Sequence, residues 1–306
     1  MDVFGAINRS WNTSKGALFA PFNVGTWLAF GFVSFLASLI DPSGGTGRLN
    51  LPGGGGGRPT TPTGPGAPPA DFDELVRWLH EHADLLVALG ALALVTAIVV
   101  GLVFVWLGCR GLMIAYRSVA LGHVAIGEGW RETRAPANAL FWTYAIFSAV
   151  SFVLMVPLAI LAIVRCLALY EGGERDAGVY FTALAPHAIV LGVGALLGLL
   201  VGFVLRCFIA PYLLFFRCTV GEAWSRFFSV LREHTGGVIL FVVARAVLAT
   251  VIGVLSAIVS TCTCCVGGLP VLHQTILAPV YFFDRAFTLH ALASIDQEHA
   301  LLAPST

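Results

Sequence analysis

The chain has 306 residues, of which 58% are hydrophobic and only 11% are charged. Soluble domains average about a quarter charged residues, so this composition excludes an ordinary water-soluble globule. The 17 basic residues balance the 17 acidic residues, and a net charge of zero argues against nucleic acid as a partner. We therefore expect membrane lipids to surround much of the protein.

Six apolar runs follow one another along the chain, and each is long enough to cross a bilayer as a helix. About 20 apolar residues are needed to cross roughly 30 Å of hydrocarbon. The runs show no alternation of polar and apolar residues, which favours helices over a barrel. The predicted spans are 22–40, 84–107, 138–164, 181–207, 236–260 and 268–292. The expected fold class is an all-α polytopic membrane protein with six transmembrane helices.

Residues 1–40 are predicted to form an amphipathic segment followed by the first span. A polar lead with Arg9 and Lys15 precedes the apolar run, and no small-x-small cleavage pattern follows it. We therefore expect a retained span rather than a signal peptide. Residues 41–70 then contain ten glycines and seven prolines. Such a composition predicts a disordered linker outside the cytoplasm.

The remainder, 71–306, is predicted to hold an interfacial helix and five further spans. Apolar residues recur at helical spacing over 71–83. Trp78 within this stretch suits the boundary between membrane and water. We interpret the stretch as a helix that leads along the membrane surface into the second span.

Basic residues are distributed unevenly between the alternate connections. Eleven lysines and arginines fall on the side that holds both termini, five fall on the other side, and Arg245 lies within a span. Positive residues gather on the cytoplasmic side of membrane proteins. This pattern predicts a membrane protein with both termini in the cytoplasm.

A short theme recurs before alternate spans. Gly-Glu-Gly-Trp ends at Trp130 and Gly-Glu-Ala-Trp ends at Trp224, while the N-terminus carries a looser copy up to Trp11. Thr219 and Glu222 have the spacing of a capping box, which marks the start of a helix. We infer three repeated units, each an amphipathic cytoplasmic helix followed by a two-span hairpin. Trp130 and Trp224 are the expected interfacial anchors.

Several stretches resemble uncharacterised bacterial and archaeal six-span membrane proteins related to the membrane domain of glycerophosphoryl diester phosphodiesterases. The matching stretches are 109–131, 138–142, 223–227, 264–270 and 279–285. The resemblance implies a six-helix membrane fold and says little about activity. No stretch reads as the soluble phosphodiesterase barrel, so phosphodiester cleavage is not carried over.

Arg245 is the sharpest polar feature within a predicted span. A charge there costs about 2.5–3.5 kcal/mol on insertion scales, so it requires a partner or a route to the surface. Asp284 near the cytoplasmic end of the last span is the candidate partner. Snorkelling to the headgroups is an alternative, and a third is binding of an anionic substrate or lipid phosphate at Arg245 and Asp284.

Two further clusters offer weaker chemistry. Cys262 and Cys265 have C-x-x-C spacing and form a candidate disulfide, although small residues in a tight hairpin are the simpler interpretation. A metal is less favoured there because no second nearby pair completes a four-ligand site. The stretch 80–84 lacks the H-E-x-x-H spacing of a zinc helix. We therefore expect no metal.

No nucleophile elbow, Walker loop or dinucleotide glycine pattern is present in the sequence. We therefore expect no cofactor and no catalysis. The favoured hypothesis is a membrane scaffold or accessory subunit that binds lipid, partner subunits or further copies of itself. The alternative is a transporter or channel for an anionic or lipid-like substrate near Arg245, although the nearly all-apolar spans show no polar stripe for a pore.

Overall fold

The computed structural model describes residues 3–20, 22–40, 83–173, 176–262 and 270–295. Every regular element within these residues is helical. The helices, in chain order, are α1 (Val3–Phe19), α2 (Val24–Ser38), α4 (Ala83–Leu121), α5 (Ile126–Glu132), α6 (Arg134–Glu171), α7 (Ala177–Val204), the π-helix η1 (Leu205–Ile209), α8 (Ala210–Phe215), α9 (Val220–Glu233), α10 (Thr235–Cys262), α11 (Pro270–Ile276) and α12 (Ala278–Ile295).

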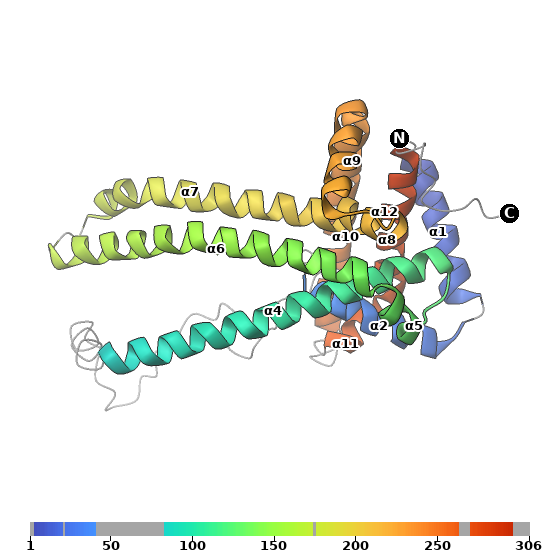
Figure 1. Cartoon of the computed structure of the whole chain (residues 1–306), viewed down its shortest axis with the longest axis horizontal. Coiled ribbons are helices and arrows are strands. Elements are labelled where there is room, and N and C mark those ends of the chain that lie inside the picture. Colours follow the sequence, from blue (N-terminus) through green and yellow to red (C-terminus); the bar gives the residue numbers. More distant parts are fainter. Residues whose placement is uncertain (1–2, 21, 41–82, 174–175, 263–269, 296–306) are drawn as a thin grey trace.

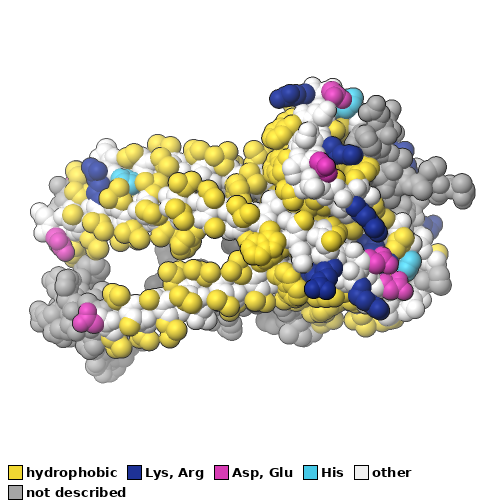
Figure 2. All heavy atoms as spheres, in the orientation of Figure 1, with side chains coloured by type: hydrophobic (Ala, Val, Ile, Leu, Met, Phe, Trp, Pro, Cys, Tyr) yellow, Lys and Arg dark blue, Asp and Glu magenta, His cyan; other side chains and the backbone are white. Residues whose placement is uncertain are grey.

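Three long helices, α4, α6 and α7, extend from a compact end of the molecule (Figure 1). That end, which we call the head, comprises α1, α2, α5, α8, α9, α11, α12 and residues 109–121 of α4. Helix α9 lies crosswise to α6 and α7 (Figure 1). Figure 2 shows apolar side chains along the long helices and most charged side chains over the head. This separation is the one expected where a bilayer meets water.

Four stretches are long and apolar enough to cross a membrane: 87–121, 134–171, 177–215 and 235–262. In the most apolar part of the first two stretches, 87–121 and 134–171, no residue is buried. Extended apolar surface of this kind is stable only against lipid or another protein. The chain is therefore a membrane-embedded protein, and four of the six predicted spans correspond to such helices.

The two remaining predicted spans differ from expectation. Helix α2 has 15 residues, which is about 22 Å at 1.5 Å per residue and shorter than a usual span. The run 268–292 is interrupted at Leu277 between α11 and α12, because Pro279 cannot donate a backbone hydrogen bond and is tolerated only near a helix start. Helix α12 is buried in the head along most of its length. Six spans and three repeated units are therefore not confirmed.

Glycines let α2 approach its neighbours closely. A Cβ atom on Gly111 of α4 would lie 2.6 Å from the backbone nitrogen of Ala37. A Cβ atom on Gly31 of α2 would lie 2.7 Å from the Cα atom of Thr275 in α11. Real Cβ atoms do not come this close to backbone, so α2 is held between α4 and α11 at positions that exclude any side chain.

Helix α1 packs against α12 through small residues. Ala6, Ser10 and Ser14 are buried, and both serine hydroxyls donate to the backbone carbonyl four residues earlier. Thr13 Oγ1 lies 3.1 Å from His290 Nε2 of α12. Phe4 and Trp11 remain largely exposed. The helix therefore has one face packed within the head and an apolar face that is exposed.

The start of α9 is fixed by the predicted capping box. The Thr219 backbone N–H donates to Glu222 Oε2 at 2.8 Å, and the Glu222 backbone N–H donates to Thr219 Oγ1 at 3.3 Å. Ala223, Phe227 and Val230 are buried on one face of the helix. Figure 1 places α5 and α9 at the same end of the long helices, as the repeated Trp motifs predicted.

Replacing Thr219 with alanine is expected to destabilise the fold by about 1 kcal/mol, because the Glu222 N–H loses its side-chain acceptor. The change is measured as a shift in the unfolding midpoint of the purified protein in mild detergent. Thr219→Ser keeps the hydroxyl and serves as the matched control. Equal losses for the serine and alanine variants would show that the cap is not the source of the stability.

Candidate functional site

Helix α10 carries one buried stripe towards α12, and Arg245 stands in its middle. The stripe consists of Val238, Phe241, Arg245, Ile252 and Ser256. Phe241 stacks on Phe287 of α12, with ring centroids 6.1 Å apart. The spacing of three to four residues places these side chains on one helix face. An arginine on such a face requires a buried partner.

Asp284 is that partner. The guanidinium of Arg245 forms an ion pair with the Asp284 carboxylate, and the two residues are 8% and 3% exposed. The predicted pairing is therefore present, and the Arg245 side chain is buried rather than extended to a lipid surface as the snorkelling interpretation required. Binding of a ligand or lipid at Arg245 and Asp284 stays a prediction.

Three further residues extend the pair into a cluster. Arg285 Nη1 lies 3.9 Å from Asp284 Oδ2, and its guanidinium lies 5.7 Å from the centroid of the Tyr116 ring. The Tyr116 hydroxyl donates to the carbonyl of Arg206 at 2.9 Å. Helices α4, α10 and α12 and the π-helix η1 therefore meet at one buried polar centre, which we call the Arg245 cluster (Tyr116, Arg206, Arg245, Asp284, Arg285).

The π-helix within this cluster has a local cause. Pro211 follows η1 and has no backbone N–H, so it cannot close the usual helical bond to the residue four positions earlier. Its ring also crowds that carbonyl, which widens the preceding turn. Such π segments often occur at functional sites. Here the widened turn presents the Arg206 carbonyl to Tyr116.

Two arginines of the cluster share one carboxylate, because Arg245 and Arg285 both approach Asp284. Burying an ion is costly unless it is paired, and removing one partner strands the other. The physical role that follows from this geometry is to fix four helical segments to one another.

Another buried arginine, Arg110, lies between two tryptophans outside this cluster. The Arg110 guanidinium lies 5.4 Å from the Trp106 ring centroid and 5.2 Å from that of Trp130. Its Nη1 donates to the Trp130 carbonyl at 2.8 Å. Cation–π contacts of this kind strengthen when water is excluded. Trp130 therefore joins α5 to α4 through Arg110. The prediction of Trp130 as an anchor at the membrane interface did not include this contact.

A family model described as a family of unknown function, DUF7544, matches residues 1–302. The chain belongs to the DUF7544 family. Neither a curated protein nor a solved structure matches it. The comparisons give no link to the glycerophosphoryl diester phosphodiesterase membrane domain, so that part of the predicted resemblance has no support. A membrane-type pattern of apolar runs is shared by many unrelated families, so such a pattern alone does not establish a relationship.

Of the remaining predicted site residues of this DUF7544 protein, the structure describes Trp224 and Cys262. Trp224 packs on Phe228, with ring centroids 5.7 Å apart. Cys262 is exposed at the end of α10, while Cys265, Trp78 and the predicted linker 41–70 lie outside the described residues. The disulfide and the interfacial helix therefore stay predictions.

Sequence reasoning missed Trp106, Tyr116 and Arg285 as parts of buried contacts. Arg285 had been counted among the basic residues of the cytoplasmic side, although its position beside Asp284 signals a shared site. Trp106 precedes Arg110 by four residues, and that spacing places the two on one helix face. Tyr116 has no such signal, because its contact with Arg206 joins residues 90 positions apart.

Proposed function

We propose that this protein is a non-catalytic membrane scaffold or accessory subunit. In this proposal the long apolar helices hold the protein in the bilayer, and the head presents amphipathic helices α1 and α9 to lipid and to partner subunits. The proposal places the chain in the cytoplasmic membrane of a bacterium or archaeon. It also places both termini and helices α1, α5 and α9 on the cytoplasmic side, following the distribution of basic residues.

The observation that carries the proposal is the exposure of the long helices. Helices α4 and α6 diverge away from the head (Figure 1), and Figure 2 shows an opening between the apolar rods. The most apolar parts of both helices contain no buried residue. Helices that enclose a conduction path need polar side chains facing one another. No charged residue lies between Leu85 and Leu107 of α4, or between Pro136 and Val164 of α6.

A transporter or channel near Arg245 is less well supported. An anionic substrate at Arg245 would have to replace Asp284, which already pairs with it in a buried position. Paired charges of this kind in membrane proteins often hold helices together. The proposal therefore assigns Arg245 and Asp284 to assembly of the fold.

We also propose that the chain crosses the membrane six times and that the six spans form three repeated units. They require α2 and α12 to cross the bilayer as buried helices rather than as lipid-facing ones. The tight contact of α2 with α4 at Gly111 supports such a position for α2. Pairing of Asp284 with Arg245 supports it for α12, because a paired charge is far less costly in a bilayer than a lone one.

Gentle purification of the full-length protein from its native membrane tests the proposed function. We expect a protein partner, or a second copy of the chain, to co-purify in fixed stoichiometry and to be cross-linked to residues of α1, α9 or the long helices. A matched variant, Trp11→Ala, removes a largely exposed ring from α1 and leaves the Arg245 cluster unaltered. It is expected to weaken partner recovery without loss of folded protein.

The proposal is contradicted if the purified protein is monomeric without partners and moves an anion across the membrane of proteoliposomes. Flux that is abolished by Arg245→Gln in protein that remains folded would favour the transporter instead. Turnover of a substrate by the purified chain would contradict the non-catalytic assignment.

A further inference from the structure

A cleft of about 850 Å³ lies in the head beside the first turns of α6. It is bounded by the end of α4, the junction of α5 and α6, α8, and the loop that leads into α9. Its floor is apolar and includes Leu121, Ala139, Leu213 and Leu214. The volume is in the usual range of ligand-binding pockets, which are apolar with a few polar groups at defined positions.

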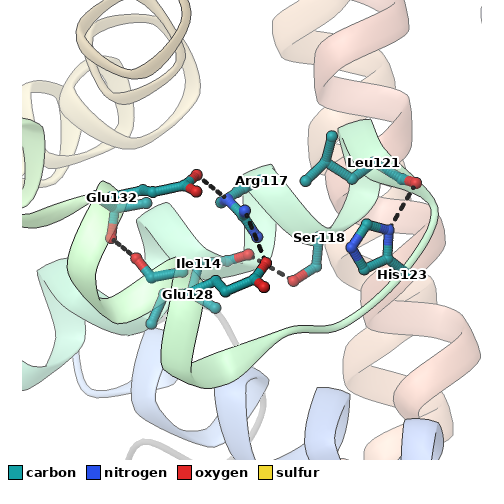
Figure 3. Close-up of polar contacts among 9 residues, drawn as sticks. Ile114, Arg117, Ser118, Leu121, His123, Glu128 and Glu132 are labelled. Carbon is teal, nitrogen blue, oxygen red and sulfur yellow. Dashed lines mark hydrogen bonds and ion pairs between the residues drawn. The ribbon is translucent and has the colours of Figure 1, made fainter.

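The polar groups at the rim of the cleft are unequal in charge. Arg117 lies between two carboxylates, with Nε 2.8 Å from Glu132 Oε2 and Nη2 3.6 Å from Glu128 Oε2 (Figure 3). Two carboxylates therefore engage the one guanidinium of Arg117, which leaves this side of the rim with a net negative charge. Glu222, in the first turn of α9, accepts the Thr219 N–H in the capping box, and it forms no ion pair with Arg217 within the described residues.

Arg217 is the cation that remains. It lines the cleft, it is exposed, and it has no ion-pair partner within the part of the chain that the structure describes. Its φ angle is +48°, and among described residues other than glycine it is the one with a positive φ. Arginine is disfavoured in this region, where glycine and asparagine are tolerated. An arginine at such a position is consistent with use of its guanidinium.

Two residues near Arg217, Arg226 and Cys218, bring no negative charge to this part of the cleft. The Arg226 guanidinium lies 4.6 Å from the centroid of the Phe216 ring, the residue before Arg217. Cys218, which also lines the cleft, has its pKa raised by burial, with the Arg226 charge acting in the opposite direction. The partly buried thiol of Cys218 therefore adds no negative charge to the cleft.

The cleft is adjacent to the membrane-facing part of α6. Ala139 on its floor is followed within one turn by Trp142, which is 63% exposed. Exposed tryptophans favour the boundary between headgroups and acyl chains. An occupant whose polar end lies at Arg217 can therefore extend an apolar end along α6 into the bilayer.

We propose that this cleft binds one anionic phospholipid, with its phosphate at Arg217 and its acyl chains over Ala139, Leu213 and α6. The inference rests on the proposed membrane-embedded function and adds the class of lipid and its site. The guanidinium recognises phosphate oxygens through paired hydrogen bonds, and the apolar floor accepts the glycerol backbone and the first methylenes. A zwitterionic phospholipid lacks the net charge that Arg217 would balance.

Native mass spectrometry of the full-length protein in neutral detergent tests the site. The probes are dioleoyl phosphatidylglycerol and dioleoyl phosphatidylcholine, titrated separately. We expect one tight phosphatidylglycerol site. Arg217→Gly and Arg217→Asn are expected to weaken it at least fivefold, while phosphatidylcholine binding is unchanged. Both variants tolerate the positive φ, so the unfolding midpoint is expected to stay equal or rise. Arg217→Lys keeps the charge and is expected to retain part of the affinity.

The matched control is Arg232→Gln, which removes an arginine from the exposed end of α9 and leaves the cleft intact. The proposal is overturned if Arg217→Gly binds phosphatidylglycerol as tightly as the wild-type protein, or if Arg232→Gln weakens binding equally. Flotation with lipid vesicles distinguishes failure of the proposed lipid site from failure of the proposed membrane function. A protein that inserts but shows no selective site disproves only the lipid cleft, whereas a protein that does not insert disproves the membrane function itself.

Discussion

Asp284→Asn is expected to be among the most damaging single substitutions in the chain, with a loss of about 3–5 kcal/mol of folding free energy. The substitution preserves the size of the side chain but removes the one carboxylate that both Arg245 and Arg285 approach. Arg245 then loses its buried counter-charge, and Arg285 loses its contact with Asp284. The loss is measured as unfolding in mixed micelles of mild detergent and dodecyl sulfate, followed by Trp fluorescence, with folded yield after size exclusion as a second readout.

The double exchange R245D/D284R distinguishes a pair from two separate effects. It is expected to recover at least half of the loss, because opposite charges again meet at the same two positions. Glu171→Gln, at the exposed end of α6, is the control and is expected to lie within about 0.5 kcal/mol of the wild-type protein. Failure of the exchange to recover any folded protein would show that the Arg245–Asp284 contact is not what holds α10 to α12.

Gly111→Ala is expected to destabilise the protein by about 1–3 kcal/mol, as overpacking typically does. The added methyl group would meet the backbone of Leu36 and Ala37 in α2, and backbone cannot move aside as a flexible side chain can. The measurement is the same unfolding transition, combined with proteolysis of α2 as a readout of its release from α4.

Gly101→Ala on the same helix is the matched control, because a Cβ at Gly101 meets nothing within 4 Å. Alanine favours a helix over glycine, so this variant is expected to be stabilised by up to about 1 kcal/mol. If both variants were stabilised, α2 would not be held against α4 as the structure places it.

Much of the fold was predictable because composition and hydrophobic length carry the signal for lipid-facing helices. Four of the predicted apolar runs correspond to α4, α6, α7 and α10. The majority of their predicted ends lie within a few residues of the observed helix ends. The capping box at Thr219 and the buried face of α9 were predicted from spacing alone and confirmed by the hydrogen bonds and burial. Local chemistry fixes these features.

The errors arose where tertiary packing decides. Helix α4 continues beyond Leu107 to Leu121 as one helix, because Arg110 is enclosed by two tryptophans that its own sequence neighbourhood does not disclose. Helix α12 is nearly as apolar as a span, yet its Asp284 and Arg285 require a polar centre supplied by α4 and α10. Hydropathy measures how apolar a segment is, and it cannot tell lipid from protein as the neighbour.

The Arg245 pair was predicted because an intramembrane charge demands a partner and few acids were available. The lipid cleft was not, since it is assembled from the end of α4, the α5–α6 junction and the α8–α9 loop. Its most telling residue, Arg217, is distinguished by backbone conformation rather than by sequence pattern. A sequence shows that an arginine is present and does not show that it occupies a position suited to glycine.

Labelling of single cysteines with a membrane-impermeant maleimide in intact cells tests the membrane arrangement most directly. The seven native cysteines are first replaced, and His123→Cys in the head and Glu171→Cys at the far end of α6 are compared in separate variants. We expect the position at 171 to react from outside, and the position at 123 to react only after the membrane is opened. Reaction of both positions from the same side would contradict a membrane crossing by α6.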